Sequence, residues 1–131
     1  MSKFESIWED FRKSLKRLEE VLKEEKTEIV RDSAIKRFEI AFDLAWKTVK
    51  AYLEDQHNLT CVSPQSCLRE AFRVGLIDYD DYWMEITKAR NLTVHTYNEI
   101  LAERIYNELP HVIVTFKNLD TKIEREIRDK V

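Results

Sequence analysis

The sequence is poor in the residues that make turns. Its 131 residues include one glycine and two prolines, whereas 36% are charged and 44% are hydrophobic. This composition predicts long amphipathic helices with short connections, because a sheet protein needs more turn formers. The single glycine also argues against a glycine-rich phosphate loop, and no convincing strand presents metal-holding aspartates. We therefore expect neither a kinase-like nor a nucleotide-polymerising centre, and no cofactor.

Two further shortages bear on location and partners. No apolar run approaches the length of a membrane span, and the N-terminal segment MSKFESIWEDF carries acids and lacks the apolar core of a secretory signal. We therefore expect a cytoplasmic protein without membrane contact. The formal net charge of −3 shows no basic excess of the kind that is typical of proteins that bind duplex DNA. Any contact with nucleic acid must then be local and confined to a cleft.

Cysteine is scarce as well. Cys61 and Cys67 are the only two, and the five residues between them do not match a zinc-knuckle spacing. No second pair exists to complete four ligands. Because disulfides are unusual in a reducing cytosol, we expect two reduced, partly buried thiols.

A metal-binding bundle is a second possibility that the sequence disfavours. Di-iron bundles use Glu-x-x-His on two helices plus a glutamate from each of two others. The spacing occurs twice, but the first copy adjoins a loop and the second straddles Pro110. The first apolar stripe contains no carboxylate to complete a site. We therefore predict no metal site.

Apolar periodicity predicts three long helices. Their stripes cover residues 4–22, 30–53 and 101–123. The second stripe is wide enough to face two neighbours, so its helix should be central. Thr27 and Asn98 can cap the second and third of these helices. Pro110 should kink or restart the last one, and the charged end from about residue 120 should fray.

Shorter helices should lie between the second and last stripes. Ser63 before Pro64 is typical of a helix start, and Gly75 is well placed to end that helix in a left-handed conformation. Asp78 can cap a further helix from about Tyr79 through Arg90. The expected fold is therefore all-α, a single domain over residues 1–131 built as an antiparallel up-and-down bundle of four to five helices. Apolar surface on two faces of the long helices would suit a homodimer.

The segment ARNLTVHTYNE, at residues 89–99, combines side chains that suit phosphodiester chemistry. Arginine offers a planar fork of donors matched to phosphate, and histidine can act as base or acid near neutral pH. In a straight helix, residues five apart are separated by about 140°, so Arg90 and His95 would not share a face. The β-branched Thr93 and Val94 weaken the helix there. A bend at these residues would let His95 swing back toward Arg90.

Cleaving RNA without metal needs a base for the 2′-OH proton, an acid for the leaving oxygen and a cation on the phosphate. One histidine cannot easily fill both proton-transfer roles, so a dimer would have to supply a second copy. Asn91 can orient the imidazole or donate to phosphate, and Tyr97 offers a hydroxyl as a hydrogen-bond partner or as an acceptor for a transferred group. From the residues alone, an ordinary helix end with a solvated arginine remains an alternative.

The motif Arg90-Asn91-x-x-x-His95 resembles the signature of HEPN domains. Its extension to Tyr97 resembles the form found in HEPN toxins that are encoded beside a minimal nucleotidyltransferase. The segments RFEIAFDLAWKTVKAYLEDQ and ARNLTVHTYNEILAERIY resemble a narrower branch, the nucleotidyltransferase substrate-binding proteins. The likeness extends from about residue 4 to 119. It implies a helical bundle that dimerises with its two motifs facing across a shared cleft.

The resemblance also implies roles for individual residues. Active members are metal-independent ribonucleases, so Arg90 and His95 would be the catalytic pair and Asn91 a supporting neighbour. The partner nucleotidyltransferase acts as antitoxin by transferring AMP to the motif tyrosine, here Tyr97, which would block the cleft with bulk and negative charge. The expected partners are thus a minimal nucleotidyltransferase, RNA as substrate and a second copy of the chain. Two alternatives stay open: a non-catalytic substrate-binding subunit of a two-component nucleotidyltransferase, and a structural bundle whose Arg–His pair is incidental.

Overall fold

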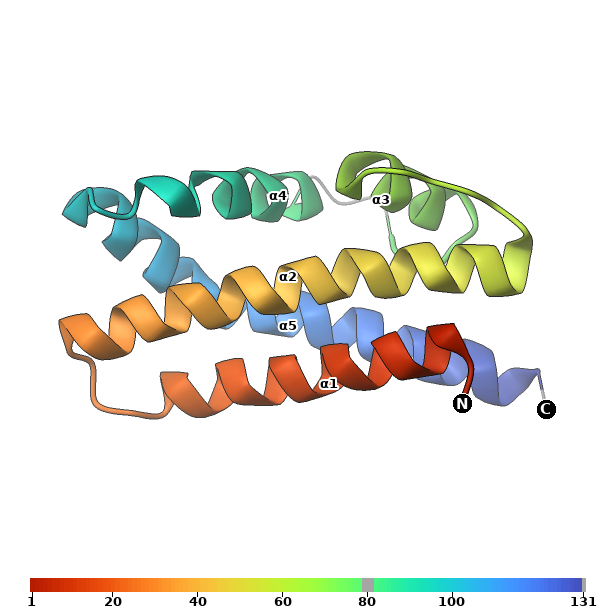
Figure 1. The fold of residues 1–131 in the computed structure, drawn as a ribbon, viewed down its shortest axis with the longest axis horizontal. Coiled ribbons are helices and arrows are strands. Elements are labelled where there is room, and N and C mark those ends of the chain that lie inside the picture. Colours follow the sequence, from red (N-terminus) through yellow and green to blue (C-terminus); the bar gives the residue numbers. More distant parts are fainter. Residues whose placement is uncertain (79–81, 131) are drawn as a thin grey trace.

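The computed structural model describes residues 1–78 and 82–130 (Figure 1). Within these ranges the chain forms five α-helices and one short 3-10 helix, and no strand. They are α1 Lys3–Leu22, α2 Glu28–His57, α3 Pro64–Arg73, α4 Tyr82–Leu92, η1 Thr93–His95 and α5 Glu99–Asp129. The expected all-α class is confirmed. The expected start of the fourth helix at about Tyr79 lies outside the described residues.

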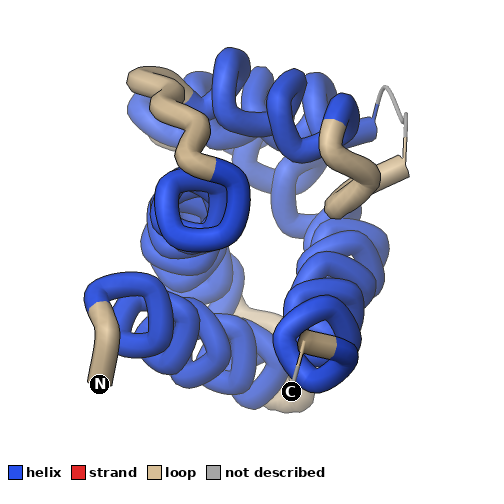
Figure 2. The backbone as a smooth tube through the Cα atoms, turned by 90° about the vertical axis from the view of Figure 1, so that its right-hand side faces the viewer, coloured by secondary structure: helices blue, strands red, loops and turns tan. Residues whose placement is uncertain are grey.

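The helices form an up-and-down bundle in which α3 and α4 share one leg. Figure 1 shows α1 and α2 as an antiparallel pair, α3 and α4 end to end along α2, and α5 returning to the end of the molecule where α1 begins. Seen end-on, the four legs surround a common interior (Figure 2). Since α2 contacts each of the other four α-helices, its predicted central position is confirmed.

Side-chain caps fix where the helices begin, as the sequence predicts. The Thr27 hydroxyl accepts a hydrogen bond from the backbone N–H of Val30 at 3.1 Å, and the Asn98 side chain accepts one from Leu101 N–H at 3.1 Å. Ser63 caps α3, with Pro64 at its first position. Each cap satisfies a backbone donor that the first helical turn would leave unpaired.

The α3 helix ends before Gly75, whose φ of +83° is the left-handed conformation predicted for it. Only glycine adopts this conformation without a steric cost from a Cβ atom. The chain can therefore turn away from α3 toward α4, which is packed into the core through Trp83 and Ile86. Trp83 stacks on Phe116 of α5, with ring centroids 5.6 Å apart.

Two expectations concern the α5 helix. It is continuous through Pro110, so the helix does not restart there. Pro110 lies on the exposed side of α5, and its buried neighbours Leu109 and Val112 hold the helix in the core. Burial of these side chains, at roughly 1.5–3 kcal/mol each, offsets the hydrogen bond that the proline removes.

The charged end of the chain is helical to Asp129, so the expected fraying from about residue 120 is wrong. Ile123 is fully buried in the core. Asp120 accepts hydrogen bonds from Trp8 Nε1 at 2.7 Å and from Arg12 Nε at 2.8 Å. A buried apolar side chain and polar contacts to α1 therefore keep this segment helical. The high charge of the segment alone did not indicate these contacts.

The connection between α2 and α3 also corrects an expectation. Cys61 and Cys67 form a disulfide instead of two reduced thiols, with their Cα atoms 5.2 Å apart. The loop after α2 turns back onto the first turn of α3, which brings the two side chains together. Both are buried. The disulfide ties the loop to the helix that it precedes.

No helix in the described ranges is both long and apolar enough to cross a lipid bilayer.

Candidate functional site

Arg90 lies in the last turn of α4 and points toward α2. Its Nε and Nη2 donate to the two carboxylate oxygens of Asp43, at 3.1 Å each, which is a side-on bidentate pair. Its Nη1 donates to the Thr93 hydroxyl at 3.1 Å. The side chain keeps 25% of its surface exposed. Arg90 is therefore held in one orientation without being buried.

The Arg90 guanidinium is electrostatically fixed as a cation. The hydrogen bonds to Asp43 raise the pKa of Arg90 above its ordinary value, and partial burial opposes this only in part. Glu39 adds to the negative field, with its Oε2 3.9 Å from Nη1. Arg90 can therefore bind anions but cannot serve as a proton donor.

Thr93 ends α4 by forming local hydrogen bonds. Its side chain is buried, and its hydroxyl donates to the Arg90 carbonyl at 2.8 Å while accepting from the Arg90 guanidinium. The chain then tightens into η1, and Thr96 donates its hydroxyl to the Thr93 carbonyl at 2.9 Å. Side-chain bonds of this kind compete with the helical pattern. The break that the sequence predicted at Thr93 and Val94 is confirmed.

His95 and Tyr97 both lie on the surface after this break. The Tyr97 hydroxyl is 3.5 Å from His95 Nδ1, and the two rings meet edge to face. Tyr97 is 82% exposed. Within the described part of the chain, the hydrogen bonds of the Arg90 guanidinium go to α2 and to Thr93 and not to His95. Asn91 is exposed beside Arg90.

Two site residues were missed from the sequence, Glu39 and Asp43. They lie one turn apart on α2, inside the segment RFEIAFDLAW, at the flank of its apolar stripe. Carboxylates that flank a wide apolar stripe on a central helix need a partner on a neighbouring helix. That signal could have pointed to a cation, although not to Arg90 in particular.

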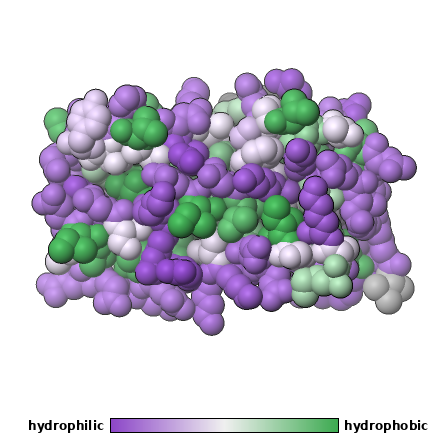
Figure 3. Space-filling view, in the orientation of Figure 1, coloured by the Kyte–Doolittle hydropathy of each residue, from purple (hydrophilic) through white to green (hydrophobic). Residues whose placement is uncertain are grey.

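The motif segment also exposes apolar side chains. Four large ones lie within nine residues of the chain: Leu92, Val94, Tyr97 and Ile100. Figure 3 shows apolar surface in the region where α4 gives way to α5. We call these four residues the motif patch. A concentration of exposed apolar side chains is typical of a surface that another molecule covers.

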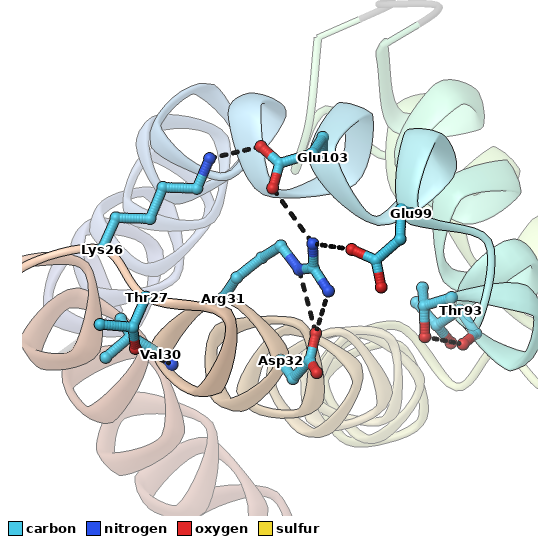
Figure 4. Close-up of polar contacts among 9 residues, drawn as sticks. Lys26, Thr27, Val30, Arg31, Asp32, Thr93, Glu99 and Glu103 are labelled. Carbon is cyan, nitrogen blue, oxygen red and sulfur yellow. Dashed lines mark hydrogen bonds and ion pairs between the residues drawn. The ribbon is translucent and has the colours of Figure 1, made fainter.

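A buried arginine anchors the start of α5, directly after the motif (Figure 4). Arg31 of α2 is 4% exposed and donates to Glu99 at 2.6 Å, to Glu103 at 3.1 Å and to Asp32 at 3.0 Å. Lys26 also pairs with Glu103. The bonds to these acids, that to Glu99 first, raise the pKa of Arg31, while Lys26 and then Arg31 lower the pKa of Glu103. The first turns of α5 are thereby fixed to the start of α2.

The two Glu-x-x-His pairs do not form a metal site in the described ranges, where no three His, Cys, Asp or Glu side chains are arranged so that they could hold a metal ion. His111 instead stacks on Tyr82, with ring centroids 3.8 Å apart. Glu108 accepts the Tyr82 hydroxyl hydrogen bond at 2.9 Å. The second pair thus packs against α4.

Comparison with known families identifies the chain. A family model described as nucleotidyltransferase substrate binding protein like matches residues 7–125. The chain belongs to this family. The resemblance seen in the sequence is thereby confirmed at the level of the family, and it covers both the Arg90–Asp43 pair and the motif segment.

The chain is also similar to individual proteins. A protein of Haemophilus influenzae named "Probable ribonuclease HepT" is 30% identical over 85 residues, which cover 62% of this chain. The match spans 58% of the length of that relative. A crystal structure of a Thermus thermophilus protein is 36% identical, with a TM-score of 0.77, covering 83% of this chain and 94% of the other.

A second solved structure shares the fold at lower identity. It is HI0074 from Haemophilus influenzae, described as having the fold of a substrate binding domain of a nucleotidyltransferase. The two chains are 20% identical, with a TM-score of 0.69 over 92% of this chain and 96% of HI0074. At this identity the similarity establishes the shared fold alone.

Proposed function

We propose that the chain is a HEPN toxin-like, metal-independent endoribonuclease of a toxin–antitoxin pair, working as a homodimer. Arg90 binds the scissile phosphate, His95 transfers protons and Asn91 supports them. The observation that carries the proposal is the fixed, part-exposed guanidinium of Arg90 beside a helix break that presents His95. The HepT relative, named as a ribonuclease, supports the same reaction class.

The reaction balances with these groups. A neutral imidazole takes the 2′-OH proton, the 2′-oxygen forms a bond to phosphorus, and the bond from phosphorus to the 5′-oxygen breaks. A second, protonated imidazole gives its proton to that leaving oxygen. The products are a 2′,3′-cyclic phosphate and a 5′-hydroxyl. Because each chain has one motif histidine, the second imidazole comes from a partner copy, and the exposed Leu92, Val94 and Ile100 of the motif patch offer apolar surface for that contact.

Tyr97 is the proposed site of neutralisation. Its phenol is 82% exposed and therefore open to a partner enzyme. A nucleotidyltransferase would join the phenol oxygen to the α-phosphorus of a nucleoside triphosphate, with release of pyrophosphate and of the phenol proton. The family description supports a nucleotidyltransferase partner. The added phosphate would lie in the same short segment as the His95 imidazole and would compete for the Arg90 cation.

The test is RNA cleavage by the purified chain in the presence of EDTA. Arg90→Ala and His95→Ala should each lower the rate by about 10²-fold or more. His111→Ala, which removes an exposed histidine outside the motif, is the matched control and should leave the rate unchanged. Intact RNA after long incubation with the unmodified chain would refute the enzyme.

Mixing the unmodified chain with His95→Ala tests whether each site takes an imidazole from two copies. A mixed dimer of the unmodified chain and His95→Ala has one motif imidazole instead of two and should not cleave RNA. In an equimolar mixture with free subunit exchange, about half of the unmodified chains pair with the variant, so the activity per unmodified chain should fall to about half. Light scattering gives the oligomeric state in the same samples, and a strictly monomeric chain would contradict the two-copy site.

A second candidate is a binding subunit that docks a nucleotidyltransferase and presents its acceptor without cleaving RNA. The family description favours it. It predicts stable co-purification with a nucleotidyltransferase whose activity is insensitive to His95→Ala. Cleavage that is lost with His95→Ala would decide for the ribonuclease.

A further inference from the structure

We propose that Asp43 is the positioning residue that presents Arg90 to phosphate, and that Glu39 opposes phosphate at the same guanidinium. The inference rests on the proposed function, because it assigns the phosphate-binding side of that site. Both acids come from α2, one turn apart, and both face Arg90. They nevertheless stand in different geometries.

Asp43 uses one edge of the guanidinium and leaves another for a ligand. Arginine has five N–H donors. Asp43 takes one from Nε and one from Nη2, and Thr93 takes one from Nη1. One hydrogen then remains on each terminal nitrogen. These two can form a second fork for two phosphate oxygens.

The bidentate pair also fixes where that fork points. Arg90 sits one turn before a helix break, so its backbone alone holds a long, flexible side chain poorly. Asp43 lies near the middle of the central helix, between the buried residues Phe42 and Ala45. A carboxylate on a rigid element that binds two donors removes most of the rotamer freedom of the arginine. Binding phosphate then costs less ordering.

Glu39 acts in the opposite sense. Its Oε2 is 3.9 Å from Nη1, which is too long for a hydrogen bond, so it adds charge without fixing geometry. Lys36 Nζ lies 3.6 Å from the same carboxylate, and the lysine is mostly exposed. A phosphate approaching the terminal nitrogens meets the negative charge of Glu39 on its way. Glu39 therefore weakens anion binding at Arg90.

A matched pair of substitutions separates positioning from charge. Asp43→Asn and Glu39→Gln each turn a carboxylate on the same face of α2 into an amide of the same size, and each removes one negative charge near Arg90. Charge alone would make both variants bind RNA more tightly. Positioning predicts opposite outcomes, because the Asp43→Asn amide can turn only one acceptor toward Arg90 and presents an NH₂ group in place of the other.

The binding probe is a single-stranded RNA of ten nucleotides with 2′-O-methyl riboses, which cannot be cleaved by 2′-OH attack. Asp43→Asn should raise the dissociation constant about tenfold, and Glu39→Gln should lower it about three-fold. Asp43→Glu restores the carboxylate and should recover part of the affinity. Tighter binding by both amide variants, or equal weakening by both, would overturn the proposal.

A second readout does not depend on RNA. In ¹⁵N-arginine NMR spectra, the Arg90 Nε–H of the unmodified chain should exchange slowly with water, and about tenfold faster in Asp43→Asn but not in Glu39→Gln. Equal exchange in the unmodified chain and Asp43→Asn would overturn the positioning role. If the unmodified chain neither binds nor cleaves RNA but shows the protected Nε–H, the ribonuclease fails while the Asp43–Arg90 geometry stands.

Discussion

Two arginines pair with acids from a neighbouring helix, but they differ in how far they are buried. Arg31 is 4% exposed and gives its guanidinium to three carboxylates. Arg90 is 25% exposed and gives its guanidinium to one bidentate carboxylate and one hydroxyl. Arg31 therefore joins two helices and has little left for a ligand, whereas Arg90 is oriented and still open.

In this bundle, burial distinguishes the structural cation Arg31 from Arg90, the cation that we propose binds phosphate. Burying a guanidinium costs free energy unless carboxylates pair with its charge. At the start of α2, Arg31 meets two such carboxylates on α5. The end of α4 meets only the flank of α2, so Arg90 keeps part of its solvent contact. A guanidinium that is held in one orientation but remains partly exposed to solvent can exchange its bound water for phosphate.

Arg90→Lys should have the largest effect. Lysine keeps the charge but cannot bind Asp43 and a phosphate with two parallel forks, so RNA cleavage should fall about 10²-fold or more. The thermal midpoint should change by less than about 4 °C, since a pair that keeps contact with solvent contributes about 1 kcal/mol or less. Cleavage rates and thermal melts of the two proteins check this. If the loss of activity only reflected a loss of folded protein, Arg90 would have a structural role like that of Arg31.

Arg31→Met should be next, and its effect should be on folding. The substitution removes charge-assisted bonds to α5 from a buried site, so the free energy of unfolding should fall by about 2 kcal/mol. Arg12→Met is the control, because Arg12 pairs with two acids but is 41% exposed, and it should lower the free energy by less than about 1 kcal/mol. Urea denaturation measures both. Equal losses would mean that burial does not set the difference.

The pH dependence of the Arg31 network is a smaller effect. Lys26 and Arg31 hold the pKa of Glu103 below its ordinary 4.5, so folding favours the carboxylate. The contribution of Glu103 is therefore complete above pH 4.5 and is lost as the pH falls through the lowered pKa.

Glu103→Gln tests this sign. The stability gap between the unmodified chain and Glu103→Gln should be widest near neutral pH and should shrink below pH 4.5. In an Arg31→Met background, the same substitution should give a smaller gap with a weaker pH dependence. Thermal midpoints across the acid range measure both. A gap that widens on acidification would contradict the assignment.

Much of the fold followed from the sequence because local rules dominate it. Apolar periodicity located the three long helices, and Thr27, Ser63 and Asn98 marked helix starts through their own side chains. The expectations that failed depended on contacts that apolar periodicity does not give. The charged end of α5 is ordered by contacts to α1, and the disulfide depends on how the loop after α2 folds back.

The candidate site divides in the same way. The motif located Arg90, His95 and the helix break, which are local features. Its acidic partners were missed because Asp43 lies 47 positions before Arg90. Periodicity assigns a residue to a face of its helix but does not say which neighbour that face meets. The ion pairs of Arg31 with α5 could not be predicted from the sequence for the same reason.

The smallest effect separates the residues that we propose bind phosphate from Tyr97, which we propose a partner modifies. Tyr97→Phe removes one hydroxyl whose contact to His95 Nδ1, at 3.5 Å, is long for a hydrogen bond. The free energy of unfolding should change by less than about 0.5 kcal/mol, and RNA cleavage should stay within about two-fold. Addition of AMP by the proposed partner nucleotidyltransferase should vanish, because the acceptor oxygen is gone. Mass spectrometry after incubation with that enzyme and ATP checks this prediction. Tyr106→Phe is the control, because Tyr106 is a half-buried tyrosine on α5 that packs against Lys26. If Tyr97→Phe lowered the cleavage rate as much as Arg90→Lys, the Tyr97 hydroxyl would belong to the catalytic groups. Arg90 would then need that hydroxyl for cleavage.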